Sequence, residues 1–456
     1  MQKLNWSINL NPYRLSPTLD VPELYSNTDW AVEQLSDLGV TMVRVDILWA
    51  LVQPDADGFA AEAIGWYRHF FGKLAEAGIG VYAVLYNPPA WSADLVHTDL
   101  DAFHAAWRGY CRMISRELAE RVTIFQVWNE PNNYLSHLKD DVNLFHTKAF
   151  SVGGWKVTLP TGVHWKALVP LFTIAREELP AGSSIAYNAI TNLNDFTPAA
   201  LPAWTEWEHF TDQLLARAGD AIDVIAIDHY PDTWLPGVGP LSWDCLDEAA
   251  KRVNDPRSAW YGKTIILGEL GYSSCQNVPI LKRPRMNFFP DDHSEESMEA
   301  WYAEALPFLA DRMRPDRWPH NRHHVINAYE LQDPPALSIF GGEHHEVVGI
   351  EYHFGLLRQD GSPKPAYGVF KDVAAGRPLP APNRASRGKT GPLNVYIKTS
   401  QVSKTVHRWV SPLAYAVYQA VRPPLRRHDT GFLSFGALLI LYQVWRAALG
   451  RRTADP

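Results

Sequence analysis

The chain has 456 residues, of which 46% are apolar and 12% aromatic, so it is long enough for one large buried core or two smaller ones. Its three cysteines, at positions 111, 245 and 275, have no close spacing or even pairing, which argues against a disulfide framework and a zinc ribbon. Charge is unevenly divided: residues 1–376 hold 29 Lys and Arg against 48 Asp and Glu, whereas residues 377–456 hold 13 against two. This asymmetry predicts an acidic domain over 1–376 followed by a basic tail over 377–456.

Short apolar runs alternate with segments of helical periodicity along the first 376 residues. In chain order, a strand over 6–10 precedes a helix that opens at 27–29 and runs to about 37. Further strands are predicted over 41–49, 80–86, from 123, and over 184–190, 221–230, 264–270 and 323–331; further helices over 59–77, 100–120, 164–178, 204–218, 241–253, 295–312 and 365–375. This alternation predicts an α/β fold, a (β/α)8 TIM barrel over residues 1–376, with its active site at the strand C-termini.

The strand that begins at Thr123 ends in a carboxylate. Its β-branched and aromatic run stops at Asn129-Glu130-Pro131. Pro131 lacks an N–H and biases Glu130 toward extended geometry, so the strand should end with a Glu at its mouth. A Glu there needs water, a partner or a substrate. Taken alone, it could simply be a solvated residue that caps the next turn.

A second predicted strand, over 264–270, also carries a Glu near its C-terminal end, at Glu269. Strand C-termini of a parallel barrel share one rim, so Glu130 and Glu269 should lie close together. Two carboxyl groups ~5 Å apart, one protonated and one ionised, are the groups that retaining glycoside hydrolysis uses.

The segments Trp128-Asn129-Glu130-Pro131-Asn132 and Gly268-Glu269-Leu270-Gly271-Tyr272 resemble the acid/base and nucleophile motifs of the clan of retaining glycoside hydrolases built on TIM barrels, with families 39 and 5 nearest. The resemblance covers most of residues 4–376. It implies that Glu130 is the general acid/base and Glu269 the nucleophile. The chain departs from the pattern at Ala328, where many members carry a Trp, so Tyr329 could take that place. The β-sandwich that often follows the barrel in family 39 is not expected here.

Two polar residues are predicted to assist the glutamates. Asn129 would hydrogen-bond the sugar 2-hydroxyl, or it could simply turn the chain before Pro131. Arg44 lies in the middle of an apolar strand, where a guanidinium needs a carboxylate. It would steady Glu269, or it would form a core ion pair with Asp46 or another acid.

Aromatic side chains and a histidine complete the predicted site. His229 or Tyr230 would donate to Glu269, and Tyr230 is favoured because neighbouring residues of a strand point to opposite faces. Ring faces at strand mouths suit stacking on sugars, although Trp is also common in barrel packing. The predicted substrate-binding aromatics are Trp49, Tyr86, Trp91, Trp234 and Tyr329.

Neither a metal nor a cofactor is expected. The histidine clusters 320/323/324 and 344/345 lack an HExxH motif or a Cys partner, and no glycine pattern of a nucleotide-binding loop follows a strand. We expect an oligo- or polysaccharide substrate and no nucleic-acid partner. Three readings of the barrel stay open: a retaining β-glycoside hydrolase, a transglycosylase that uses the same site, and a non-catalytic glycan-binding barrel.

The basic tail holds two apolar segments, 409–421 and 432–445, flanked by arginines. Neither reaches the roughly 18–20 residues needed to span a bilayer. Their aromatic content suits interfacial helices on an anionic leaflet, with peripheral membrane contact through 409–452. The alternative is a helical hairpin packed on the barrel or on a partner subunit. The first residues show no signal-peptide pattern, so we expect a cytoplasmic protein, held at the inner face of the membrane if the tail binds there.

Overall fold

The computed structural model describes residues 4–133, 144–152, 155–191, 207–231, 233, 240–241, 243–275, 281–282, 285–286, 293–334 and 349–379. The apolar segments of the tail, Trp234 and the cluster His344/His345 lie outside these residues. Within the described part of the chain, no helix combines the length and apolar character needed to cross a membrane.

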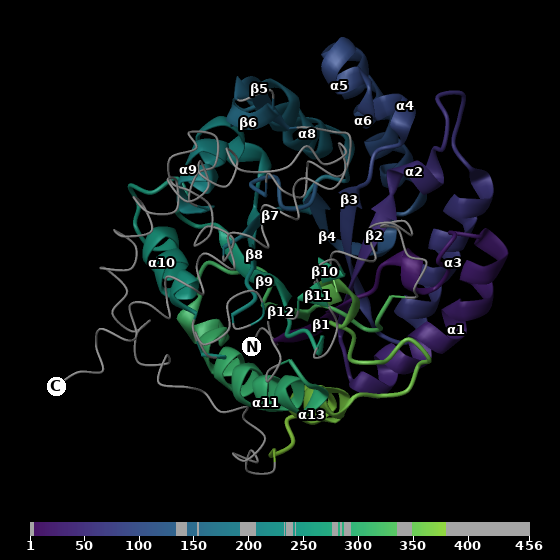
Figure 1. Cartoon of the computed structure of the whole chain (residues 1–456), viewed down its shortest axis with the longest axis vertical. Coiled ribbons are helices and arrows are strands. Elements are labelled where there is room, and N and C mark those ends of the chain that lie inside the picture. The colour runs from purple at the N-terminus through teal and green to yellow at the C-terminus, as the bar shows by residue number, and fades with distance from the viewer. Residues whose placement is uncertain are drawn as a thin grey trace.

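Eight parallel strands close into a barrel (Figure 1). They are β1 (Asn5–Asn9), β2 (Met42–Leu48), β3 (Gly80–Tyr86), β4 (Val122–Val127), β7 (Ser184–Ile190), β8 (Val224–Asp228), β9 (Thr264–Leu270) and β12 (Val325–Ala328). Neighbours pair in the order β1-β12-β9-β8-β7-β4-β3-β2, and pairing of β1 with β2 closes the ring. All strand C-termini therefore meet at one mouth, and the predicted (β/α)8 fold is confirmed.

Helices form an outer ring around the barrel (Figure 1). They are α1 (Val21–Leu38), α3 (Ala61–Glu76), α6 (Leu100–Glu117), α8 (Trp165–Glu178), α9 (Trp207–Ala218), α10 (Asp244–Val253), α11 (Glu295–Arg312) and α13 (Pro365–Ala374), with the short α2 (Trp49–Val52), α4 (Ala90–Ala93) and α5 (Leu95–Thr98). The first helix begins at Val21, earlier than predicted. Asp20 caps it by accepting a hydrogen bond from the Glu23 N–H at 3.2 Å, and Pro22 occupies the first turn, where no N–H is required.

An antiparallel hairpin that the sequence analysis did not predict lies between β4 and α8. Its strands are β5 (Phe145–Val152) and β6 (Trp155–Val163), and Figure 1 shows the hairpin beside α8. Phe145 and Val163, which pair at its base, are both buried. A second, very short pair, β10 (Leu281–Lys282) with β11 (Arg285–Met286), follows β9.

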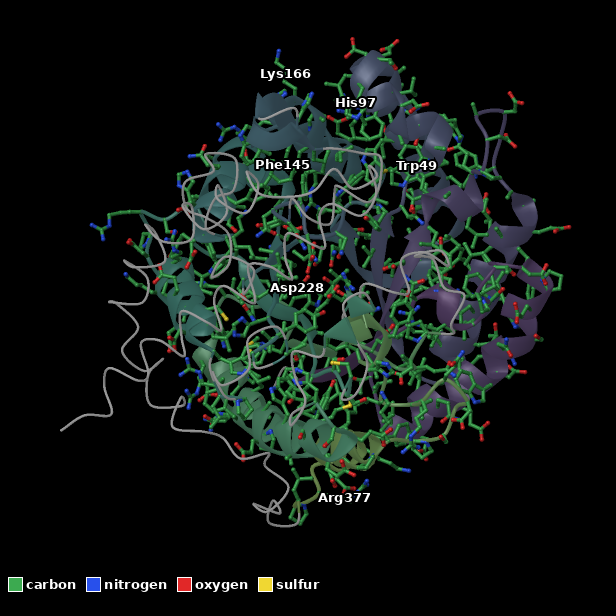
Figure 2. All side chains as sticks on the ribbon, viewed as in Figure 1. Trp49, His97, Phe145, Lys166, Asp228 and Arg377 are labelled. Carbon is green, nitrogen blue, oxygen red and sulfur yellow. The ribbon has the colours of Figure 1, made fainter. Side chains whose placement is uncertain are left out.

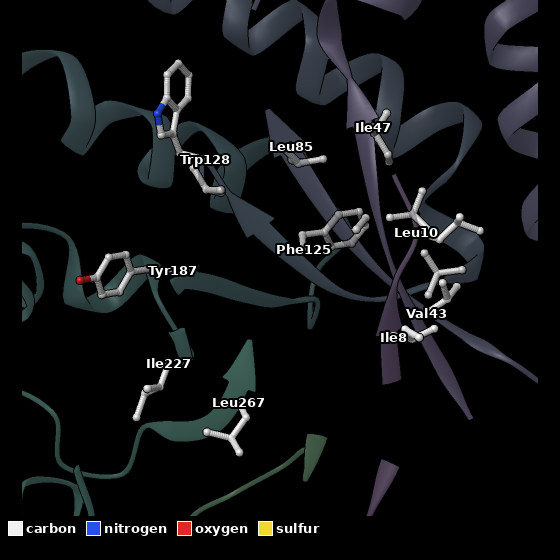
Figure 3. Packing of buried hydrophobic residues seen from close by; sticks show 14 of the residues in the cluster. Ile8, Leu10, Val43, Ile47, Leu85, Phe125, Trp128, Tyr187, Ile227 and Leu267 are labelled. Carbon is white, nitrogen blue, oxygen red and sulfur yellow. The ribbon is translucent and has the colours of Figure 1, made fainter. Parts of the chain in front are cut away.

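Alternation along the strands sorts their side chains between the helices and the barrel interior. Outward-facing apolar residues pack beneath the helices, and Figure 3 shows some of them, including Ile8, Val43, Phe125, Ile227 and Leu267. Inward-facing residues at the lower end of the barrel fill a separate apolar cluster: Met42, Tyr82, Ile124, Ala186, Val224, Ala226, Ile266 and Val325. Full burial of a Val, Ile or Met side chain in this cluster stabilises the fold by about 1.5–3 kcal/mol. The interior is therefore a packed core rather than a pore.

Closer to the mouth of the barrel, the inward positions of the strands hold polar side chains instead of apolar ones. The inward positions toward the mouth hold Asn9, Arg44, Gln126, Asn188, Asp228 and Asn327, and all six residues are buried. Figure 2 places Asp228 near the middle of the barrel. A polar layer buried beneath the mouth requires mutual hydrogen bonding, and this layer forms the base of the site described next.

Candidate active site

Glu130 lies in the tight turn that follows β4. The prediction that Pro131 would keep Glu130 extended is wrong, because Glu130 has φ 41° and Trp128 has φ 66°. Residues with side chains rarely adopt these values, so the surrounding contacts must hold them. The Glu130 N–H donates to Asn188 Oδ1 at 2.7 Å, and Asn133 Nδ2 donates to Glu130 Oε2 at 2.8 Å. The turn thus aims a buried carboxyl group at the mouth of the barrel.

Glu269, on β9, is held by a cation and a phenol. Arg44 Nη1 lies 2.7 Å from Glu269 Oε1, and the Tyr230 hydroxyl donates to Oε2. Arg44 therefore pairs with Glu269, one of the two arrangements that the sequence left open. Both donors are buried, so the Glu269 side chain is held in one orientation.

The two glutamates and Asp228 converge. One carboxylate oxygen from each of Glu130, Asp228 and Glu269 lies within 4.8 Å of those of the others. Burial, and then the charge of Glu269, raises the pKa of Glu130 to about 8. A carboxyl group with a raised pKa thus lies beside another that is bound to a guanidinium, an arrangement that can supply a proton donor and a carboxylate at one site.

Asn129 receives three donors on a single atom. Its Oδ1 accepts from Arg44 Nη2 at 2.9 Å, from Asn188 Nδ2 at 2.9 Å and from Gln126 Nε2 at 3.3 Å. Because the oxygen is fixed by these donors, the amide Nδ2 is oriented as a donor on the other side of the group. Asn129 is partly exposed, so that donor can reach a ligand.

The sequence analysis missed the residues beneath this network. Gln126, Asn188 and Asp228 are buried and connect Arg44, Asn129 and the Glu130 turn. The signal was present, because each is a polar residue at an inward position of an otherwise apolar strand. The sequence alone does not show which partners such polar groups contact across the barrel.

Three predicted aromatic residues are partly exposed: Tyr86, Trp91 and Tyr329. Tyr329 lies edge-on to Tyr230, with ring centroids 6.2 Å apart, and thus beside Glu269. Tyr86 packs edge-on against Trp128 at 5.5 Å, next to the Glu130 turn. Trp91 lies further out, with its Nε1 donating to the Gln53 carbonyl at 3.3 Å.

The structure corrects the predictions that Trp49 and His229 bind the substrate. Trp49 has no exposed surface; it stacks on Tyr110 with ring centroids 5.1 Å apart, and Figure 2 shows it toward the outer helices. It is a packing residue because it begins α2, where the chain leaves the barrel.

The His229 ring contacts Thr191 and lies edge-on to Trp243, so Tyr230 is the inward-facing member of the pair His229 and Tyr230. Ala328, where a Trp was expected, belongs to the outward core cluster.

The three converging carboxylates also have the spacing of a cation site. At least four of their six oxygens, however, already accept from side chains: both oxygens of Glu269 from Arg44 and Tyr230, Glu130 Oε2 from Asn133, and Asp228 Oδ2 from Asn188. The donor set therefore fits acid–base work better than metal chelation.

No protein-family model matches the sequence, and neither does any curated protein. Solved structures do match the fold. A β-glucosidase from Exiguobacterium marinum superposes with a TM-score of 0.53 at 12% identity, over 83% of this chain and 99% of that one. An exo-β-1,4-mannosidase from Opitutaceae bacterium strain TAV5 gives 0.51 at 16%, over 82% and 59%.

A third structure, of a family 5 protein from Bifidobacterium longum in complex with Manβ1-4GlcNAc, gives a TM-score of 0.52 at 15% identity, over 82% of this chain and 78% of that one. Glycoside hydrolases share this barrel. At these identities the likeness concerns the fold alone, and it agrees with the resemblance found in the sequence.

Proposed function

We propose that the chain is a retaining β-glycoside hydrolase acting on an oligo- or polysaccharide. The observation that carries the proposal is the pair Glu130 and Glu269: both are buried at the barrel mouth, with oxygens within 4.8 Å and different partners. Oxygens this close favour the ~5–5.5 Å carboxyl separation of retaining enzymes over the ~6.5–9.5 Å that an inverting enzyme needs for its water.

In the first step, Glu269 attacks the anomeric carbon while Glu130 gives its proton to the leaving oxygen. The C1–O bond breaks and a C1–Oε bond forms. Arg44 and the Tyr230 hydroxyl hold Glu269 in place for the attack. The Asn129 amide, turned outward by its three donors, binds the sugar 2-hydroxyl, a contact that strengthens in the transition state.

In the second step, Glu130 acts as a base. Having lost its proton, it removes one from a water molecule, which attacks C1 and releases Glu269. The same residue serves both steps because its surroundings raise its pKa to about 8, close to neutrality. Tyr329, partly exposed beside Tyr230, offers an aromatic ring for contact with the sugar.

A screen with aryl β-glycosides of several sugars tests the proposal, followed by NMR of the first-formed product. We expect hydrolysis of at least one β-glycoside with retention of the anomeric configuration, because the two carboxyl groups are too close to admit a water molecule between them. Inversion would mean that at least one of these glutamates is not a partner in the reaction. Absence of turnover on all substrates would favour the non-catalytic barrel.

The pH dependence of kcat/KM follows from the Glu130 proton. Glu130 must be protonated in the first step, so the rate should be high below about pH 8 and fall as the pH rises through that value. The loss should be about tenfold per pH unit on the alkaline side. A rate that keeps rising above pH 8 on a substrate with a poor leaving group would contradict the role of Glu130 as general acid.

Transglycosylation is the alternative, since a sugar could replace water in the second step at the same glutamates. Product mixtures measured at high acceptor concentration separate the two reactions. Attachment of the tail to a membrane, and with it a cytoplasmic location at the inner face, stays a prediction, because residues 409–452 lie outside the described part of the chain.

A further inference from the structure

Asp228 is a third carboxyl group in the site, with no part in the mechanism above. It ends β8, is fully buried and faces the barrel interior. Its Oδ2 accepts a hydrogen bond from Asn188 Nδ2 at 2.6 Å. Among the described residues, its Oδ1 has no hydrogen-bond partner, although it too is buried. A buried oxygen without a donor indicates a carboxyl group that is not held as an anion.

The surroundings of Asp228 supply too little positive charge for an anion. The titratable and charged groups that act on it come from several strands around the barrel: Arg44 on β2, Tyr82 on β3, Glu130 after β4, Tyr187 on β7, Tyr230 after β8 and Glu269 on β9. The one cation of this set, Arg44, lies 2.7 Å from Glu269. Burial, and then the charges of Glu269 and Glu130, raise the pKa of Asp228 well above its usual value.

The neighbouring strand leaves room for this carboxyl group. A Cβ at Gly268 would lie 2.5 Å from Asp228 Oδ1 and 2.9 Å from Ala226 Cβ, closer than real Cβ contacts. Only glycine at position 268 allows the group to sit where it does. The position of the Asp228 carboxyl group therefore depends both on β8, which carries it, and on β9, which carries Gly268.

Asp228 acts on the proposed catalytic residues through Asn188. The Asn188 Nδ2 donates both to Asp228 and to Asn129 Oδ1, while its Oδ1 accepts from the Glu130 N–H. The acceptor on Asp228 thus fixes the side chain that supports both Asn129 and the turn bearing Glu130. A neutral carboxyl group supplies that acceptor as well as an ionised one does.

We propose that Asp228 is a positioning residue that keeps its proton throughout the reaction, holding Asn188 in place without adding a second negative charge beside Glu269. What this neutral carboxyl group does for the reaction rests on the proposed function. In the resting enzyme Glu269 is the anion; in the glycosyl-enzyme it is an ester, and Glu130, having given its proton to the leaving oxygen, is the anion. With Asp228 neutral, the three groups carry one negative charge in both states, beside one guanidinium.

Asp228→Asn and Asp228→Ala test the proposal. Asparagine resembles the neutral acid in shape and keeps the acceptor, so kcat/KM at the optimum should stay within about threefold of the wild type. The alkaline limb set by Glu130 should stay within about half a pH unit, because no charge has been removed. Alanine removes the acceptor, and kcat should fall about 100-fold through misplacement of Asn129 and Glu130.

An ionised Asp228 gives the opposite pH result. Asparagine would then remove an anion beside Glu130, and the alkaline limb would move down by about one pH unit or more. That shift would overturn the proposal. So would an Asp228→Ala variant with unchanged kcat, since Asp228 would then position nothing.

Infrared difference spectra test the proton without any turnover. At neutral pH, wild type minus Asp228→Asn should show loss of a protonated carboxyl C=O band. Asp255→Asn is the matched control, because Arg257 lowers the pKa of the partly exposed Asp255 and the variant should lose a carboxylate band instead. If Asp228→Asn also loses only a carboxylate band, the proposal fails. This result stands whether or not the chain hydrolyses glycosides, so the two proposals can fail separately.

Discussion

Glu269→Gln is expected to lower kcat/KM on any β-glycoside substrate by on the order of 10⁴-fold or more. Glutamine cannot form the glycosyl ester, so the two-step path is lost. Steady-state kinetics with an aryl β-glycoside measures the effect. Mass spectrometry with a slow fluorinated substrate should detect a covalent adduct on Glu269 in the wild type and none in the variant.

The variant also breaks a buried ion pair, which has to be separated from the chemistry. Arg44 loses its charged partner, and removing one member of such a pair costs about 3–5 kcal/mol of folding stability. Glu330→Gln is the matched control: Arg14 Nε lies 2.7 Å from Glu330 Oε2, and that pair is equally buried. Thermal unfolding should show similar losses in both variants, whereas only Glu269→Gln should lose activity by several powers of ten. Equal losses of activity would indicate instability as the cause.

Glu130→Ala should separate the two chemical steps. With an activated aryl leaving group, which needs little protonation, the first step persists and the glycosyl-enzyme accumulates because no base activates water. A burst of released phenol followed by slow turnover is the expected time course. On a substrate with a poor leaving group, the rate should fall by about 10²–10⁴-fold.

Added azide should restore turnover of Glu130→Ala, because a small anionic nucleophile needs no general base and can occupy the space left by the side chain. The product should be the β-glycosyl azide, formed by a second displacement at C1. Azide should leave the wild type unaffected. A β-glycosyl azide from Glu269→Ala, with an α-glycosyl azide from Glu130→Ala, would show that the two glutamates have exchanged roles.

The barrel was predictable because its strands are buried on both faces and bounded by polar or glycine residues. The segments 80–86, 184–190 and 264–270 coincide with β3, β7 and β9 for this reason. The apolar character of these strands also made the buried polar residues that support the site hard to recognise in the sequence. Asn188 and Asp228 are single polar residues inside apolar runs, and only the assembled ring shows that they meet Asn129 and Glu130.

Alternation alone did not predict the direction of every side chain near a strand end. The register between β8 and β9 shifts at Ile227/Asp228, so Asp228 pairs with Glu269 rather than with Gly268. This irregularity brings two carboxyl groups onto the interior. Trp49 was misplaced for a related reason: the chain turns into α2 at that residue, which carries its ring out to the helices.

The buried guanidinium of Arg44 ties together parts of the chain that are distant in sequence. Its donors reach Asn9 on β1, Gln126 on β4 and Glu269 on β9. A chain that has emerged only as far as β4 holds this cation without its carboxylate, a costly state in an apolar setting. We therefore expect strands β1 to β4 to pack incompletely until β9 joins the barrel. Formation of the ion pair then links β2 across the barrel to β9, and only β12 is still needed to complete the ring between β9 and β1.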